Sequence, residues 1–289
     1  MVKFFVLSRF IVRFYKFNIV FLYFLVVSHN FTMYFQKGFF MINSNIFSNF
    51  NSKYPIYADL HTHSISSGHG SEDTITDMIR CASESGLSLF GISDHGPATS
   101  SSAKPSYFQS LKLADRDRFG IRVLYGAELN IINTAGDVDL DDDTLSTLDY
   151  AIISIHPPIF KPYHDKDLSS AYIRAMDHPK VRFLGHIDDA RFPVDFEYLL
   201  EIAKEKHVYP EINNGSLMPD AYRINGQENC RRILSICKKL DLPVLLSSDS
   251  HGKKNIGNMQ YIFPLLEELD FPAHLVLNSD LSVLSEIIR

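Results

Sequence analysis

YADLHTHSISSGHG, residues Tyr57–Gly70, is the stretch that decides the fold and the chemistry of this 289-residue chain. It begins as a short β-strand and carries His61, His63 and His69 within nine residues. Alternate side chains of an extended strand share a face, so His61 and His63 are expected to point the same way. Imidazole is the commonest metal ligand in proteins near neutral pH. The spacing therefore favours a metal site over histidines that only pack in the core or lie on the surface.

The composition is that of an ordinary globular protein, with 45% hydrophobic and 21% charged residues. One α/β domain of about 250 residues is a common size, so the length fits a single domain with an N-terminal extension. The net charge is −6 and no run of Lys and Arg follows residue 50, which argues against nucleic acid as a standing partner. Cys81, Cys230 and Cys237 lack CxxC spacing and lie apart from the histidines, which indicates reduced thiols of a cytosolic protein.

Residues 1–50 form a separate hydrophobic extension, rich in Phe and Tyr and without any acidic residue. Its longest apolar run, Ile19–Val27, is shorter than the ~20 residues of a transmembrane helix but fits the core of a signal peptide. A membrane anchor, a signal peptide and a leader from a start codon assigned too far upstream are the three interpretations. We favour the last, because Met33 and Met41 are alternative starts. We therefore expect a cytoplasmic protein whose functional domain is 51–289, with a membrane partner only if the extension is a true anchor.

From residue 56 onward, short β-branched and aromatic runs alternate with longer helical patterns. The predicted strands are Ile56–Leu60, Leu87–Ser93, Arg122–Ile131, Tyr150–Ile155, Val181–Gly185, Val208–Ile212 and Pro243–Ser247. The predicted helices are Thr74–Ser85, Ser106–Phe119, Ser169–Met176, Phe196–Lys206, Glu228–Leu240, Pro264–Leu269 and Leu281–Ile288. Alternation of strand and helix predicts a mostly parallel sheet, and seven such units predict a closed or nearly closed barrel.

Potential metal ligands lie at or near the carboxyl ends of six of these seven strands. In a parallel barrel those ends meet at one rim, where the chemistry of such folds is found. The sixth strand ends instead in Glu211 and Asn213, whose side chains alternate toward the same rim. Chance placement explains this pattern poorly, so the sequence predicts a metal-binding rim. The residues concerned are His61, His63, His95, Glu128, His156, His186, Asp249 and His251, with His69 shortly after the first strand.

Taken in order, these motifs resemble the PHP (polymerase and histidinol phosphatase) family. The resemblance covers residue 56 to the C-terminus and leaves out residues 1–50. It is closest to the stand-alone zinc phosphatases of the family, because EINN at 211–214 and GQENCRR at 226–232 also look like that subgroup. The motifs that carry it are DLHTHS, the later His69, SDHG at 93–96, the lone Glu128, the strand-end His156 and His186, and SDSH at 248–251.

The resemblance implies a distorted (β/α)7 barrel of the PHP type that binds three divalent metal ions. Zinc is the expected metal, with manganese or iron as alternatives, since nitrogen and oxygen ligands suit all three. All nine ligand positions of the family pattern hold the expected residue type. Carried over position by position, one ion would be bound by His61, His63, Glu128 and Asp249, a second by His69, His95 and His251, and a third by Glu128, His156 and His186.

Three further polar residues are expected to support the metal ligands. Asp59, two residues before His61, is expected to orient a ligand imidazole from behind. Glu211 and Asn213 either do the same, contact the substrate, or only form hydrogen bonds within the loop. The sequence Ile187-Asp188-Asp189 after His186 departs from the Pro/Gly-rich loop of the subgroup, which puts substrate preference in question.

Charge predicts the reaction. Three divalent ions, offset by the carboxylates of Glu128 and Asp249, leave a site with a net charge of about +4, which suits a phosphate dianion. We therefore expect a metal-bound hydroxide to hydrolyse a phosphomonoester of a small metabolite, because a divalent ion lowers the pKa of its bound water to ~7. An alkyl leaving group also needs a proton, and the candidate donors are Asp94, Asp188 and a metal-bound water.

Other functions remain open at this stage. A phosphodiesterase or exonuclease of the PHP type is disfavoured by the absence of a basic track. An amidohydrolase would normally bring a carboxylated Lys, and no Lys lies at a predicted strand end. A non-catalytic metal-binding module would be expected to lack some ligands. The sequence identifies neither the physiological substrate nor the oligomeric state. Loop residues that could contact a phosphorylated substrate are Ser100, Ser101, Ser102, Lys104, Lys161, His164 and Arg191.

Overall fold

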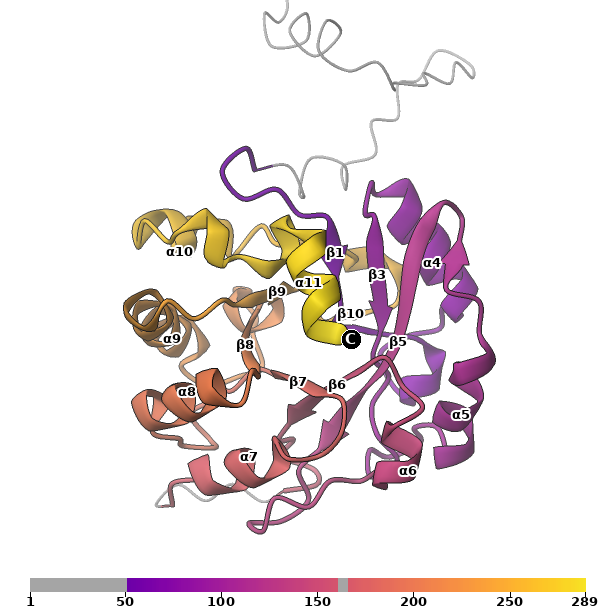
Figure 1. Cartoon of the computed structure of the whole chain (residues 1–289), viewed down its shortest axis with the longest axis horizontal. Coiled ribbons are helices and arrows are strands. Elements are labelled where there is room, and N and C mark those ends of the chain that lie inside the picture. Colours follow the sequence, from indigo (N-terminus) through magenta and orange to yellow (C-terminus); the bar gives the residue numbers. More distant parts are fainter. Residues whose placement is uncertain (1–50, 161–165) are drawn as a thin grey trace, which may run out of the picture. The chain divides into compact units, whose positions relative to one another are not determined.

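The computed structural model describes residues 51–160 and 166–289, so the predicted extension at 1–50 lies outside the described part of the chain. Seven parallel strands form one sheet whose spatial order is the order of the chain (Figure 1). This is the arrangement of a (β/α)7 barrel, as the sequence predicts. The strands are β1 (Ala58–Asp59), β3 (Leu89–Ile92), β5 (Ile121–Asn130), β6 (Tyr150–Ser154), β7 (Val181–Leu184), β8 (Tyr209–Asn213) and β9 (Leu245–Ser247).

Two short strands lie off this path and matter for the rim. β2 (Thr62–His63) follows β1, and β10 (Ser250–His251) follows β9. They pair in parallel, with His63 opposite His251, in a small sheet of their own. The first and last βα loops of the barrel are thereby joined side by side.

Helices surround the strands in Figure 1. Most predicted helices are confirmed to within two residues at each end. In the described part of the chain, short 3₁₀ turns connect the elements: η1 (Ile65–Ser67), η2 (Leu111–Leu113), η3 (Asn214–Leu217), η4 (Lys253–Asn255), η5 (Ala273–Leu275) and η6 (Leu277–Ser279). The α-helices are α4 (Ile75–Glu84), α5 (Pro105–Ser110), α6 (Asp142–Leu145), α7 (Ser169–Ala175), α8 (Phe196–Glu205), α9 (Gly226–Leu240), α10 (Phe263–Glu268) and α11 (Leu281–Ile288).

Helix α4 shows how local sequence sets these elements. The Thr74 hydroxyl accepts a hydrogen bond from the Asp77 backbone N–H, and the Asp77 carboxylate accepts one from the Thr74 N–H. This capping box satisfies donors that the first turn leaves unpaired. Met78 and Ile79 are buried on the inner face, and Gly86 follows the helix with a positive φ of 83°. The helix predicted at Thr74–Ser85 is therefore confirmed.

The predicted helix Ser106–Phe119 is wrong in its second half. The helix ends as α5 and η2, and the following Asp117–Arg118 forms β4, which pairs antiparallel with β5. The reversal occurs at Phe119 and Gly120, both with positive φ (51° and 80°). Two consecutive residues of positive φ form the tight hairpin turn that suits the twist of paired strands. Gly120, directly after the predicted helix, was the residue in the sequence that indicated this turn.

The barrel interior forms a hydrophobic cluster separate from the layer under the helices. Leu60, Tyr150 and Phe183 fill the space between the strands. Leu284 and Ile288 of α11 belong to the same cluster, so this helix closes one end of the barrel with apolar side chains. The opposite end is left for polar residues. Within 51–160 and 166–289, no helix has the length and apolar character needed to cross a membrane.

Asn278 closes the gap between β1 and β9, which are not paired directly. Its side chain is fully buried. The amide Nδ2 donates to the carbonyls of Ala58 (2.8 Å) and Leu246 (2.7 Å), and Oδ1 accepts from the Leu246 N–H at 2.7 Å. The Asn278 carbonyl accepts from the Tyr57 N–H at 3.0 Å. One residue therefore supplies the hydrogen bonds that a neighbouring strand would otherwise make.

Replacing this asparagine tests the closure. Asn278→Ala removes three side-chain hydrogen bonds and leaves buried backbone groups unpaired, each at a cost of about 1–3 kcal/mol. We expect the free energy of unfolding in urea to fall by about 3–5 kcal/mol. Gln227→Ala, at an exposed position of α9, is the control and should change it by less than about 0.5 kcal/mol. Equal stability of the two variants would contradict the closing role.

Candidate metal centre

The nine predicted ligands gather at one end of the barrel. Strand pairing accounts for much of this: β2 and β10 place His63 opposite His251, and an isolated parallel bridge places His95 opposite Glu128. His69 is the most exposed of the nine and stacks against His95 and His251, with ring centroids 4.9 and 5.0 Å apart. The ligands thus form one continuous patch, contributed by separate segments of the rim.

Glu128 lies at the centre of the patch. Its carboxylate is fully buried. Burial alone would raise its pKa, but the imidazoles of His156, His61 and His95 lower that pKa well below its ordinary value. The group is therefore an anion held among nitrogens. Its two oxygens lie 2.6–3.5 Å from a ring nitrogen of His61, His63, His95, His156 and His186.

The two oxygens of the Asp249 carboxylate contact different groups. Oδ1 lies 3.2 Å from His63 Nε2 and 3.7 Å from His61 Nε2, facing the imidazoles. Oδ2 accepts hydrogen bonds from Arg223 Nη2 at 2.7 Å and Asn213 Nδ2 at 3.0 Å. The second oxygen thus fixes the carboxylate while the first remains available to a cation.

Two of these residues have left-handed backbone conformations. The φ angle is 29° for His186 and 52° for Asp249. Non-glycine residues adopt such angles at a cost of order 1–3 kcal/mol, and they concentrate at functional sites. The surrounding hydrogen bonds must hold both side chains in place.

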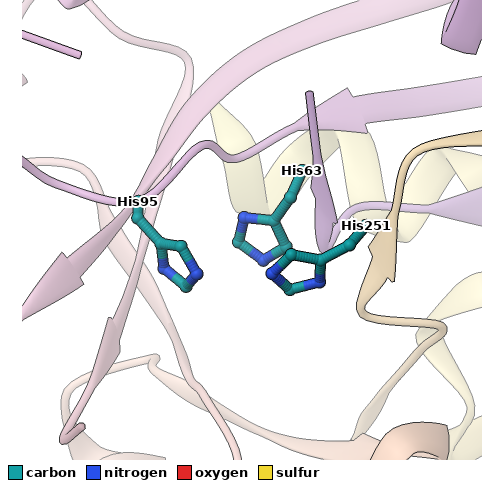
Figure 2. A group of neighbouring side chains, drawn as sticks. All are labelled: His63, His95 and His251. Carbon is teal, nitrogen blue, oxygen red and sulfur yellow. The ribbon is translucent and has the colours of Figure 1, made fainter. Parts of the chain in front are cut away.

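Three groups of side chains have ligand atoms within 4.8 Å of one another. Figure 2 shows the first, in which the rings of His63, His95 and His251 face one another from three segments. This grouping differs from the sets implied by the resemblance, because His63 joins His95 and His251 where His69 was expected. The other two groups are His61, His63 and Asp249, and His95, Glu128 and His156.

Buried atoms without partners test whether these residues fit metal ions. His61 Nε2, His63 Nε2, His95 Nδ1 and His251 Nε2 are buried without a hydrogen-bond partner, as is Glu128 Oε2. His95 Nδ1 and Glu128 Oε2 are 2.6 Å apart, yet they make no hydrogen bond. Unsatisfied buried polar atoms are costly and rare in folded proteins. Cations placed among them would satisfy all five, so the residues fit divalent metal ions.

The pKa values of His63 and His61 are shifted in opposite directions. Burial lowers the pKa of His63 well below its usual value, and His95 and His251 lower it further, which favours the neutral imidazole that metals bind. Burial also lowers the pKa of His61, but Glu211, Glu128 and Asp249 raise it well above its usual value. A proton and a metal ion would therefore compete at His61, as expected for a ligand surrounded by carboxylates.

Comparisons with known proteins show the family of this chain. The family model described as PHP domain matches residues 59–215. A protein of Clostridium acetobutylicum named a probable phosphatase is 36% identical over 231 residues, which cover 80% of this chain and 93% of that protein.

The chain belongs to the PHP family.

Two solved structures share the fold of this PHP domain. A putative histidinol phosphatase from Listeria monocytogenes aligns with a TM-score of 0.55 at 19% identity, over 71% of this chain and 99% of that chain. Histidinol phosphate phosphatase from Lactococcus lactis aligns with a TM-score of 0.53 at 19% identity, over 74% of this chain and 94% of its own, and was solved with zinc, L-histidinol and phosphate.

Some imidazoles of the PHP domain are also contacted at Nδ1, the ring nitrogen that points away from the centre. Glu211 Oε1 lies 2.5 Å from His61 Nδ1, and Glu211 Oε2 accepts from the His186 backbone N–H at 2.8 Å. His156 Nδ1 lies 2.8 Å from Asn130 Oδ1. Such contacts orient a ligand ring and select its tautomer. The sequence drew attention to Glu211 but gave no sign of Asn130, because asparagine at a strand end has many roles.

Asp59 differs from its predicted role. Its buried carboxylate accepts hydrogen bonds from the Ser248 hydroxyl at 2.5 Å and from the Gly257 N–H at 2.8 Å. No hydrogen bond to an imidazole is found for it within the described residues. Burial raises its pKa to about 6. Asp59 therefore orders the loop that carries Asp249, so it acts on the ligand through the backbone.

The two candidate proton donors lie in different surroundings. Asp94 accepts four hydrogen bonds, from the N–H and hydroxyl of Ser64, the hydroxyl of Ser67 and the phenol of Tyr107. Asp188 is fully buried, and both its oxygens lack a hydrogen-bond partner. Burial raises its pKa to about 6, against the opposing charge of Arg223.

The predicted substrate loops are only partly described. Arg191 is paired with Asp189, and the Ser102 hydroxyl donates to the Gly96 carbonyl at 2.8 Å. Lys161 and His164 lie outside the described residues. Arg223, which sequence reasoning missed, reaches the centre from the loop before α9, and nothing in its local sequence marks it.

Changing Glu211 tests the support behind His61. Glu211→Gln keeps the shape but removes the anion beside His61 Nδ1, so we expect zinc affinity to fall about 10–100-fold. Competition with a chromophoric chelator measures it. Glu228→Gln, an exposed position on α9, is the matched control and should leave affinity unchanged. Equal affinity of both variants would show that Glu211 does not support the ligand.

Proposed function

We propose that this PHP-family protein is a metal-dependent phosphatase that hydrolyses a phosphomonoester of a small metabolite. One observation carries the proposal: seven imidazoles and two carboxylates gather at one barrel end, with several buried ligand atoms unpartnered. Relatives named probable phosphatases and a structural neighbour solved with zinc, L-histidinol and phosphate support it.

The ligands that we assign to the centre are the nine residues predicted from the sequence. We propose three divalent ions, zinc in the first place, with manganese or iron as alternatives. Bound ions of this kind supply positive charge for a phosphate dianion and lower the pKa of a water molecule. The proposed ligands are His61, His63, His69, His95, Glu128, His156, His186, Asp249 and His251.

The charges next to the ligands offset only part of this attraction for phosphate. Glu211 adds a negative charge behind His61, and Arg223 adds a positive charge on Asp249. The carboxylate of Asp94, which contacts Ser67 behind His63, adds a second negative charge. These three groups together offset about one unit of the excess expected from the sequence, so the centre stays positive. Arg223 also holds the Asp249 carboxylate by one oxygen only.

Asp188 is our preferred donor of the proton that an alkyl leaving group requires. Burial raises the pKa of its carboxyl to about 6 against the charge of Arg223, so this group keeps a proton to higher pH than an exposed aspartate does. The carboxylate of Asp94 is occupied by four donors and suits proton donation less well. Both assignments remain proposals.

Metal dependence and substrate class can be tested together. Protein loaded with zinc, manganese or iron should hydrolyse p-nitrophenyl phosphate far faster than bis-p-nitrophenyl phosphate, and chelation should abolish activity. A screen of phosphorylated metabolites, histidinol phosphate included, then identifies the substrate. His156→Gln should lower metal content and activity, while His274→Gln, at an exposed position, should not. Preference for the diester would favour a phosphodiesterase, and absence of turnover on any substrate would favour a binding module.

Leaving groups separate the two proton donors. A general acid contributes typically about 10²–10⁴-fold, and the nitrophenolate ion leaves without one. Asp188→Asn should therefore slow an alkyl phosphate at least about 100-fold while slowing p-nitrophenyl phosphate much less. An equal loss on both substrates would contradict the acid role of Asp188.

A further inference from the structure

We propose that Asp94 and Ser67 are positioning residues that select the tautomer of His63. This inference rests on the proposed metal centre and assigns a task to two residues outside its ligand set. His63 belongs to two of the three ligand groups, and its Nε2 atom is the ring nitrogen that faces Asp249. The proposal follows from counting hydrogen-bond donors and acceptors behind that ring.

The carboxylate of Asp94, two residues after the end of β3, is fully buried. Oδ1 accepts from the Ser64 N–H and the Ser67 hydroxyl, both at 2.7 Å. Oδ2 accepts from the Ser64 hydroxyl at 2.8 Å and from the Tyr107 phenol. An ionised carboxylate has about four acceptor sites, so these four donors occupy all of them.

The Ser67 hydroxyl has one hydrogen to donate and two lone pairs. The hydrogen points to Asp94 Oδ1. One lone pair accepts the His95 backbone N–H at 3.1 Å. The third neighbour is His63 Nδ1 at 3.0 Å, and it can only donate to the lone pair that remains. Nδ1 of His63 therefore carries the proton.

The position of this proton decides which nitrogen of the His63 ring has a free lone pair. A neutral ring with its proton on Nδ1 has a free lone pair on Nε2. Nε2 of His63 is buried without a hydrogen-bond partner and lies 3.2 Å from Asp249 Oδ1. If Ser67 donated to Nδ1 instead, the proton would lie on Nε2 and point at the ligand groups. Asp94 prevents this by taking the hydroxyl hydrogen.

Two substitutions at Asp94 separate acceptor geometry from charge. Asp94→Ala leaves the Ser67 hydroxyl free to donate to His63, so zinc affinity should fall about 10–100-fold. In Asp94→Asn the Ser64 N–H holds the amide oxygen at the Oδ1 position, where it still accepts from Ser67. This variant should keep an affinity close to that of the unchanged protein. Tyr107→Phe, which removes a donor from Oδ2 only, is the matched control and should also keep it.

A second readout does not involve activity. Nitrogen-15 NMR of the full chain without metal reports which ring nitrogen of His63 is protonated, with a His63→Gln spectrum for assignment. We expect Nδ1–H in the unchanged protein and in Asp94→Asn, and Nε2–H in Asp94→Ala. An unchanged tautomer in Asp94→Ala overturns the proposal.

The remaining outcomes are also decisive. If Asp94→Asn loses as much zinc affinity as Asp94→Ala, charge matters instead of acceptor direction and the proposal is overturned. If Asp94→Asn keeps zinc affinity and the Nδ1–H tautomer but loses turnover of an alkyl phosphate alone, the positioning role stands and the proposed acid role of Asp188 is contradicted. If Asp94→Ala does not fold, Ser67→Ala replaces it, and unchanged zinc affinity there overturns the proposal. Failure of the unchanged protein to bind zinc would instead contradict the proposed function.

Discussion

A buried carboxylate surrounded by imidazoles is the constraint on which this structure depends. Glu128 is fully excluded from solvent and lies against five histidines, one in β2 and four in the segments that follow β1, β3, β6 and β7. An anion can be buried only where opposing charge or hydrogen bonds compensate for its lost hydration. Divalent cations among these ligands would provide that compensation. The end of the barrel around Glu128 therefore fits a bound cation.

The fold meets this constraint by keeping the two barrel ends chemically distinct. Leu284 and Ile288 of α11 close one end with apolar contacts. Polar side chains occupy the other, where every strand of a parallel barrel ends. Asn278 bridges β1 and β9, and the β2–β10 pair joins the loops beyond them. Without these two connections the first and last histidines would not be held together.

Orientation of the rings is the task of residues behind them. Glu211, Asn130 and Ser67 each contact one imidazole at the nitrogen turned away from the centre. Such contacts fix a ring before a metal arrives, so less conformational entropy is lost on binding. Asp59 and Arg223 act on the same ligands through a loop and through Asp249. The ligands are thus held by a connected set of buried polar groups.

The sequence by itself determined the seven strands, most helices and the residues that would meet at the rim. Periodicity and strand-end position depend on local chemistry, and parallel strands bring their ends together whatever the details of packing. The helix predicted at Ser106–Phe119 is wrong in its second half, because a local turn interrupts the helical pattern. Only the tertiary structure decided which imidazoles are neighbours, that His63 groups with His95 and His251, and that Asp59 faces Ser248. Asn278, Ser67 and Arg223 acquire their contacts from segments far away in the chain. No pattern in the sequence around them encodes such contacts, because hydrogen-bond partners are chosen by packing in three dimensions.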